Sequence, residues 1–86
     1  MSGFTKIDLD ARELEHPKPL EYAISALRKL DDTNYFYMRH RKNPLPLLDM
    51  AQEQGFCTLS REDKNGTWHI LIAKSRTITL EEYLCV

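Results

Sequence analysis

The stretch LEHPKPLEYAISAL, residues 14–27, carries the clearest helical pattern in the sequence. Apolar side chains recur there, and just beyond it, at the spacing of one helix face: Leu20, Ala23, Ile24, Leu27 and Leu30. Pro17 and Pro19 precede most of this run, and proline is accepted in the first helical turn because the N–H groups there have no intrahelical acceptor. The stretch therefore predicts a helix with one buried stripe, ended by Asp31, Asp32 and Asn34.

Strand patterns flank this helix on both sides. In KIDLD, residues 6–10, Ile7 and Leu9 alternate with charged side chains, so one face of the segment is apolar. After the helix, NYFYMRH, residues 34–40, is rich in aromatic residues and predicts a second strand. Its alternation sends Phe36 and Met38 to one face and the tyrosines to the other.

The second half of the chain predicts another helix and then a hairpin. RKNPLPLLDMAQEQG, residues 41–55, is typical of a short helix with Asn43 as candidate N-cap and Gly55 as its stop. FCTLSRE and TWHILIAK flank DKNG, in which Asn65-Gly66 is a strong turn signal. The predicted order is β-α-β-α-β-β.

Size and composition restrict the possible functions. A chain of 86 residues forms one domain, and a net charge of -1 argues against nucleic acid as the partner, because binding phosphates requires surplus Lys and Arg. The start MSGFTKIDLD lacks the apolar core of a secretory signal, and no apolar run approaches a membrane span of about 20 residues. We expect a cytoplasmic protein without a membrane partner; its oligomeric state is left open.

The two cysteines and the C-terminal segment complete this description. In a reducing compartment Cys57 and Cys85 are expected to be free thiols rather than a disulfide. The segment SRTITLEEYLCV, residues 75–86, still carries Ile78, Leu80, Tyr83 and Leu84. We expect it to cover part of the sheet.

The element order, together with LDARELEHPKPLEYAISAL (residues 9–27) and QGFCT (residues 54–58), resembles the TusA/SirA family of small bacterial proteins. The resemblance implies a two-layer α/β sandwich: a four-stranded mixed sheet with both helices on one face. It divides the single domain, residues 1–86, into a TusA-like core over residues 6–74 and a C-terminal extension over residues 75–86.

The same family implies a function that one residue contradicts. In TusA, a sulfur carrier, the cysteine of a Cys-Pro-x-Pro motif holds a persulfide at the start of the first helix. Here the motif reads HPKP, and His16 stands at the cysteine position. Because a histidine cannot carry a persulfide, the chain resembles most the uncharacterised branch, a domain of unknown function without this cysteine.

Topology predicts a candidate site around this motif. If the first two strands are parallel, both strand-to-helix loops leave the same end of the sheet. Two helix N-termini and a basic run then meet there and favour an anion or an acidic partner surface. The alternatives are an inert polar loop residue at position 16 and a solvated basic loop. The candidate binding residues are His16, Pro17, Lys18, Pro19, Arg39, His40, Arg41, Lys42 and Asn43.

Other chemistry has little support in the sequence. CxxC, HxxxH, HExxH, phosphate-loop and Ser/His/Asp patterns are missing, so we expect no metal, no cofactor and no catalytic residue. Cys57, at the start of the third strand, is expected at the end of the sheet opposite His16.

Three functions compete. The leading one is a non-enzymatic binding or regulatory module for a protein partner or small anion. The second is a sulfur carrier that uses Cys57 or Cys85. The third is an RNA-binding domain, because the fold implied by the family also resembles a translation initiation factor domain, but the charge balance disfavours it.

Overall fold

A computed structural model of the 86-residue chain describes residues 3–15 and 18–84. The elements follow the predicted order β-α-β-α-β-β and end in a short 3-10 helix. They are β1 (Thr5–Asp10), α1 (Lys18–Leu27), β2 (Asn34–His40), α2 (Leu45–Glu53), β3 (Cys57–Glu62), β4 (Trp68–Ala73) and η1 (Leu80–Tyr83). Over the described ranges, neither α-helix is long and apolar enough to cross a membrane.

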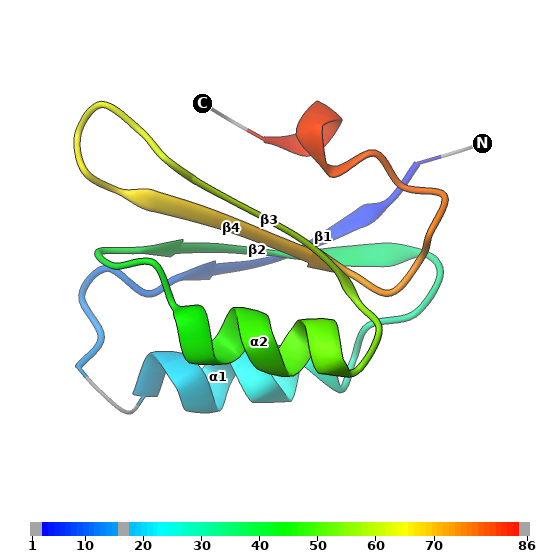
Figure 1. Ribbon diagram of the computed structural model, residues 1–86, viewed down its shortest axis with the longest axis horizontal. Coiled ribbons are helices and arrows are strands. Elements are labelled where there is room, and N and C mark those ends of the chain that lie inside the picture. Colours follow the sequence, from blue (N-terminus) through cyan, green and yellow to red (C-terminus); the bar gives the residue numbers. More distant parts are fainter. Residues whose placement is uncertain (1–2, 16–17, 85–86) are drawn as a thin grey trace.

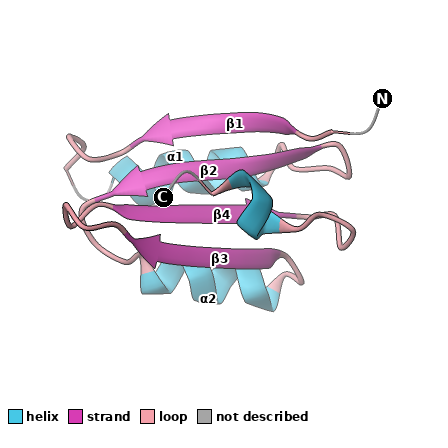
Figure 2. Cartoon of the chain, turned by 90° about the horizontal axis from the view of Figure 1, so that it is seen from above, coloured by secondary structure: helices cyan, strands magenta, loops and turns pink. Residues whose placement is uncertain are grey.

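The four strands form one mixed sheet in the order β1-β2-β4-β3. β1 pairs with β2 in parallel, whereas β4 pairs with β2 and β3 in antiparallel fashion. Figure 1 shows both helices on one face of the sheet and η1 on the other. Figure 2 shows the arrowheads of β1, β2 and β3 at one end of the sheet, which is where the chain leaves β1 and β2 toward the helices. The predicted two-helix α/β fold is confirmed.

The main core lies between the helices and the sheet. The inward side chains of the two central strands are Phe36, Met38, Ile70 and Ile72, and each is at most 1% exposed. They pack against α1, its C-terminal turn and α2 through Ala23, Ala26, Leu27, Leu30, Leu47, Leu48 and Ala51. This cluster holds the strands and both helices in one unit.

The buried stripe of α1 differs from the prediction at one position. Ala26 lies in the core, whereas Ile24 is half-buried and does not belong to the core cluster. Each residue of an α-helix is turned by roughly 100° from the one before it, so a stripe centred on Ala23, Leu27 and the following Leu30 turns position 24 toward its edge. The prediction that Ile24 belongs to the core was wrong.

The C-terminal tail covers the second face of the sheet, as expected. Tyr35, Tyr37, Leu71 and Ala73 form a second buried cluster with Ile78 and Leu80, and Tyr83 and Leu84 pack against it. The Tyr83 ring lies 4.7 Å from the ring of Tyr35, between ring centres. Two apolar faces of one sheet are thus covered, one by helices and one by the tail.

The two ends of α2 follow different rules. At its start, Asn43 is not the N-cap: Pro44 occupies that position with φ -83° and ψ 74°, and no side chain caps the helix. These angles describe an inverse γ-turn, in which the Leu45 N–H donates to the Asn43 carbonyl oxygen at 2.9 Å. The ring of Pro44 restricts φ to the range that this turn needs, so the helix begins one residue later than predicted.

At the other end of α2, Gly55 stops the helix as predicted. Its φ of 85° is left-handed. The Gly55 N–H donates to the Gln52 carbonyl and the Phe56 N–H donates to the Ala51 carbonyl, both at 3.0 Å. This pair of bonds forms the Schellman motif. The motif needs a left-handed backbone at position 55, and glycine adopts this conformation without the steric penalty of a Cβ atom.

Candidate functional site: a pocket between the helix starts

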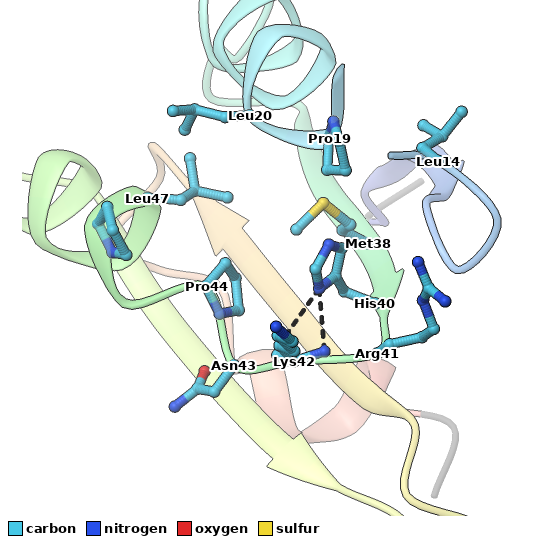
Figure 3. Close-up of a pocket in the computed structure, with 11 residues that line it drawn as sticks. Leu14, Pro19, Leu20, Met38, His40, Arg41, Lys42, Asn43, Pro44 and Leu47 are labelled. Atoms are coloured by element: carbon cyan, nitrogen blue, oxygen red, sulfur yellow. Dashed lines mark hydrogen bonds between the residues drawn. The ribbon is translucent and has the colours of Figure 1, made fainter. Parts of the chain in front are cut away.

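A pocket of about 550 Å³ opens between the starts of α1 and α2 and the end of β2 (Figure 3). Its lining includes five of the residues predicted for the site: Pro19, His40, Arg41, Lys42 and Asn43. Among the described residues, six more line it: Leu14, Leu20, Met38, Pro44, Pro46 and Leu47. The two strand-to-helix loops therefore meet at one site, because β1 and β2 are parallel and adjacent.

The pocket has an apolar interior. Met38, only 1% exposed, belongs both to the core cluster and to the lining. In Figure 3 Pro19 and Leu20 from α1, Leu47 from α2 and Met38 from β2 surround the cavity on its helix side. Met38 and Leu47 are each 1% exposed and form the floor of the pocket, so the apolar wall that solvent reaches comes from half-buried side chains such as Leu14, Leu20 and Pro44.

His40 reaches the pocket because it lies two residues after Met38 on the same face of β2. The Lys42 N–H donates to its Nδ1 at 3.0 Å, and the Lys42 carbonyl oxygen lies 3.0 Å from the same nitrogen. These two contacts require opposite tautomers, and we assign the one in which Nδ1 accepts the Lys42 N–H, which leaves the proton of a neutral ring on Nε2. Figure 3 shows this second nitrogen turned away from the Lys42 backbone, toward Met38.

The border of the pocket is basic. Arg41 and Lys42 are exposed, and no aspartate or glutamate occurs among the lining residues within residues 3–15 and 18–84. Glu13 and Glu15 flank Leu14 in the chain but do not line the pocket. The start of α2 adds the partial positive charge of the helix dipole, although the Leu45 N–H is bonded to the Asn43 carbonyl and Pro46 has no N–H. The pocket thus presents positive charge beside apolar walls.

Two of the predicted site residues that the structure describes, Lys18 and Arg39, are not among the lining residues. Lys18 is the exposed first residue of α1. Arg39 points to the opposite face of the sheet, where its Nη2 donates to Oδ2 of Asp8 at 2.9 Å. His16 and Pro17 lie outside the residues that the structure describes.

Sequence reasoning missed the apolar half of the pocket. The period of the helix stripe and the strand alternation assigned Leu20 and Met38 to apolar faces, but nothing in these patterns tells a sealed core position from one that borders an opening. Leu14 falls in a connection without a periodic pattern. The positions of the prolines, near both helix starts, were the available signal.

A polar cluster on the tail face was also missed. Tyr37, His69 and Asp63 form a chain in which the Tyr37 O–H donates to Nδ1 of His69 at 2.8 Å and His69 Nε2 donates to Asp63 Oδ2 at 2.9 Å. We assign these donors because an ionised carboxylate only accepts. His69 is 7% exposed and Tyr37 2%.

Asp63 also organises the hairpin between β3 and β4. Its Oδ1 accepts the N–H groups of Asn65 at 2.8 Å and Thr67 at 3.1 Å. The hydrogen bond from His69, followed by those backbone N–H groups, holds the pKa of Asp63 below its usual 3.8. The turn is a three-residue loop with Gly66 at φ 85°, a longer form of the tight hairpin that Asn65-Gly66 predicted.

The described cysteine lies away from the pocket. Cys57 is half-buried at the start of β3, opposite Ala73, which in turn pairs with Tyr35 at the start of β2. This is the end of the sheet opposite His40. Cys85 lies outside the described part of the chain. Within that part, no three His, Cys, Asp or Glu side chains gather in a way that would hold a metal ion.

Comparison with known proteins places the chain in a family. No curated protein and no solved structure matches the chain. A family model described as an uncharacterized conserved protein, DUF2249, matches residues 8–74, which run from within β1 past the end of β4 and include both helices and the HPKP segment. The match does not itself relate the chain to the TusA/SirA proteins. Because it covers most of the sequence, the chain belongs to the DUF2249 family of uncharacterised conserved proteins.

Proposed function

We propose that the protein is a small, non-enzymatic binding or regulatory module of the cytoplasm. It takes an anionic ligand, or the acidic surface of a partner protein, at the pocket between the starts of α1 and α2. One observation carries this proposal: an apolar-walled pocket of ligand size with Arg41 and Lys42 at its border and no carboxylate in its described lining.

The lining supports binding over catalysis. Within the part of the chain that the structure describes, His40 is the one lining side chain suited to proton transfer near neutral pH. No Ser, Thr, Cys or carboxylate stands beside it in that lining. A nucleophile and a base within reach of each other, which covalent catalysis needs, are not brought together there.

Sulfate titration followed by amide NMR tests the proposal. We expect saturable shifts at residues 18–21 and 40–48, and a decrease of these shifts in high salt because the attraction is electrostatic. Replacing both border cations, Arg41→Gln with Lys42→Gln, should reduce the shifts strongly. The matched control is Arg28→Gln with Lys29→Gln, which removes the same charge just beyond the C-terminal end of α1, where both residues are exposed. Absence of saturable shifts at both segments, or equal losses in the two variants, would refute an anion site here.

The sulfur-carrier alternative has its own test. Cys57 is half-buried and packs against the second buried cluster, the apolar one between the sheet and the tail. Neither property favours a reactive thiolate. Incubation with a cysteine desulfurase and cysteine, followed by mass spectrometry, should leave no stable persulfide. A near-stoichiometric persulfide on Cys57 or Cys85 would contradict the proposal of a binding module and support a sulfur carrier.

A further inference from the structure

We infer that the ligand of this pocket is a small carboxylic acid with an apolar body, such as an acyl chain. Its carboxylate lies at His40, Arg41 and Lys42, and its apolar part lies against Leu14, Leu20 and Pro44, above a floor formed by the buried Met38 and Leu47. This inference rests on the proposed function, because it names the chemical class of the ligand for the same pocket.

The size and walls of the pocket require an apolar body. Its volume of about 550 Å³ falls within the range of small-molecule sites, roughly 300 to 1,000 Å³. An inorganic anion at the border would leave the half-buried side chains of Leu14, Leu20 and Pro44 against water. A ligand with an acyl chain removes that apolar surface from water, and this transfer is the main source of affinity in such sites.

The pocket is also preformed. Pro19, Pro44 and Pro46 line it, and their rings restrict the backbone at both helix starts. Met38 is unbranched and adapts its shape to a chain that enters beside it. A rigid frame with one adaptable side chain lowers the entropy cost of holding a small ligand.

The polar end fits a carboxylate. If Nδ1 of His40 accepts from Lys42, Nε2–H is a donor on the pocket side, and Arg41 supplies a planar fork that matches two carboxylate oxygens. A carboxylate accepts hydrogen bonds only and carries one negative charge. A phosphate monoester brings close to two charges, and the larger cost of taking them from water counts against it beside apolar walls.

The two halves lie at the right separation for one small molecule. Met38 and His40 are two residues apart on one strand face, which places them roughly 7 Å from each other along β2. A carboxylate at His40 therefore puts the first carbons of its chain over Met38. The ligand class follows from this adjacency of a donor and an apolar floor.

Octanoate is the probe, and two fragments are its controls. Acetate carries the carboxylate alone, and 1-octanol carries the chain alone. At constant ionic strength we expect octanoate to shift the amides of residues 20, 38, 40–43 and 47 with saturation. Acetate and 1-octanol should each bind at least about tenfold more weakly, since each loses one half of the contacts.

Paired variants assign the two halves. Leu20→Ala should weaken octanoate by about three- to tenfold and leave acetate unchanged. Its matched control is Ile24→Ala, also a half-buried position of α1 but outside the lining, which should leave octanoate binding unchanged. Arg41→Gln with Lys42→Gln should weaken both octanoate and acetate, whereas Arg28→Gln with Lys29→Gln should weaken neither. A native amide spectrum shows that each variant is folded.

The outcomes separate this inference from the proposed function. Acetate binding as tightly as octanoate would overturn the inference and leave an anion site in place. Octanoate and 1-octanol binding equally, with no effect of removing the border cations, would overturn the inference and count against the proposed function as well. Shifts spread over the tail face, or none with any probe, would also overturn the inference; the sulfate titration then decides the proposed function alone.

Discussion

At the scale of single residues, alternation along β2 separates two kinds of chemistry. Met38 and His40 face the helices and line the pocket, whereas Tyr37 and Arg39 face the tail side and bond to His69 and Asp8. Neighbours in the segment YMRH therefore belong to different sites. Substitutions one residue apart are expected to have unrelated effects.

Tyr37→Phe should destabilise the protein by about 1 to 3 kcal/mol, because it leaves Nδ1 of the buried His69 without the hydroxyl that donates to it. Chemical denaturation measures the free energy of unfolding. The matched control is Tyr22→Phe, at a site that is 50% exposed, where we expect a change below about 0.5 kcal/mol. Equal effects of the two substitutions would mean that the Tyr37 hydroxyl does not matter for stability.

Asp63→Asn should reduce the loss of stability in acid. The folded protein lowers the pKa of Asp63 from 3.8, so its carboxylate stabilises the fold at pH values above 3.8. This contribution is lost as the pH falls through the lower, folded-state pKa. The free energy of unfolding of the wild-type protein should therefore approach that of the variant below about pH 4.

Unfolding curves between pH 7 and pH 2 measure this convergence. The control is Asp49→Asn, at an exposed position of α2. Its free energy of unfolding should differ from that of the wild-type protein by the same amount at every pH. A wild-type curve that stays parallel to the Asp63→Asn curve throughout would contradict the role given to the His69 hydrogen bond.

At the scale of elements, the structure differs from the expectation mainly in how α1 is rotated about its own axis. The sequence pattern allowed Ile24 into the buried stripe, but the helix turns Ala23 and Ala26 toward the sheet. Small side chains at these positions allow the helix to pack closely against the sheet at β2. Ile24 consequently stays half-buried.

Leu27→Ala should cost about 2 to 5 kcal/mol of stability, since Leu27 is 5% exposed and belongs to the core cluster. Ile24→Ala removes a side chain of similar size from the edge of the stripe and should cost less than half as much. Chemical denaturation of both variants gives the ratio. A larger loss at Ile24 would show that the helix presents the other edge of its stripe to the sheet.

At the scale of the whole molecule, one sheet holds two buried clusters. The helices cover one face, and the tail covers the other, although the tail lies beyond residues 8–74, which the family model matches. Without the tail, Tyr35, Leu71 and Ala73 would be exposed as one apolar patch. Such patches promote association of copies.

Leu80→Ala should therefore destabilise the protein by about 2 to 5 kcal/mol and increase its tendency to associate. Leu80 is buried in the second apolar cluster, between the sheet and the tail. Glu81→Ala changes an exposed residue of the same 3-10 helix and serves as control. Denaturation and light scattering report the two effects. If Leu80→Ala behaves like Glu81→Ala, the tail does not contribute to the stability of the sheet.

The sequence by itself determined the order of the elements and several of their ends. Period-two and helical patterns, the stop at Gly55 and the turn at Asn65-Gly66 are local signals, and each acts within a few residues of chain. Parallel pairing of the first two strands was enough to predict that Pro19 and residues 40–43 meet. Half of the candidate site followed from these local rules and one topological rule.

Only the tertiary structure decided the rest. It set the strand order β1-β2-β4-β3. The bond of Arg39 to Asp8 and that of Tyr37 to His69 join residues more than 30 positions apart. The apolar walls of the pocket likewise come from α1, β2 and α2 together. Local patterns state which side of an element is apolar but not which surfaces meet or where they leave a gap, because packing depends on the combined shapes of segments distant in the chain.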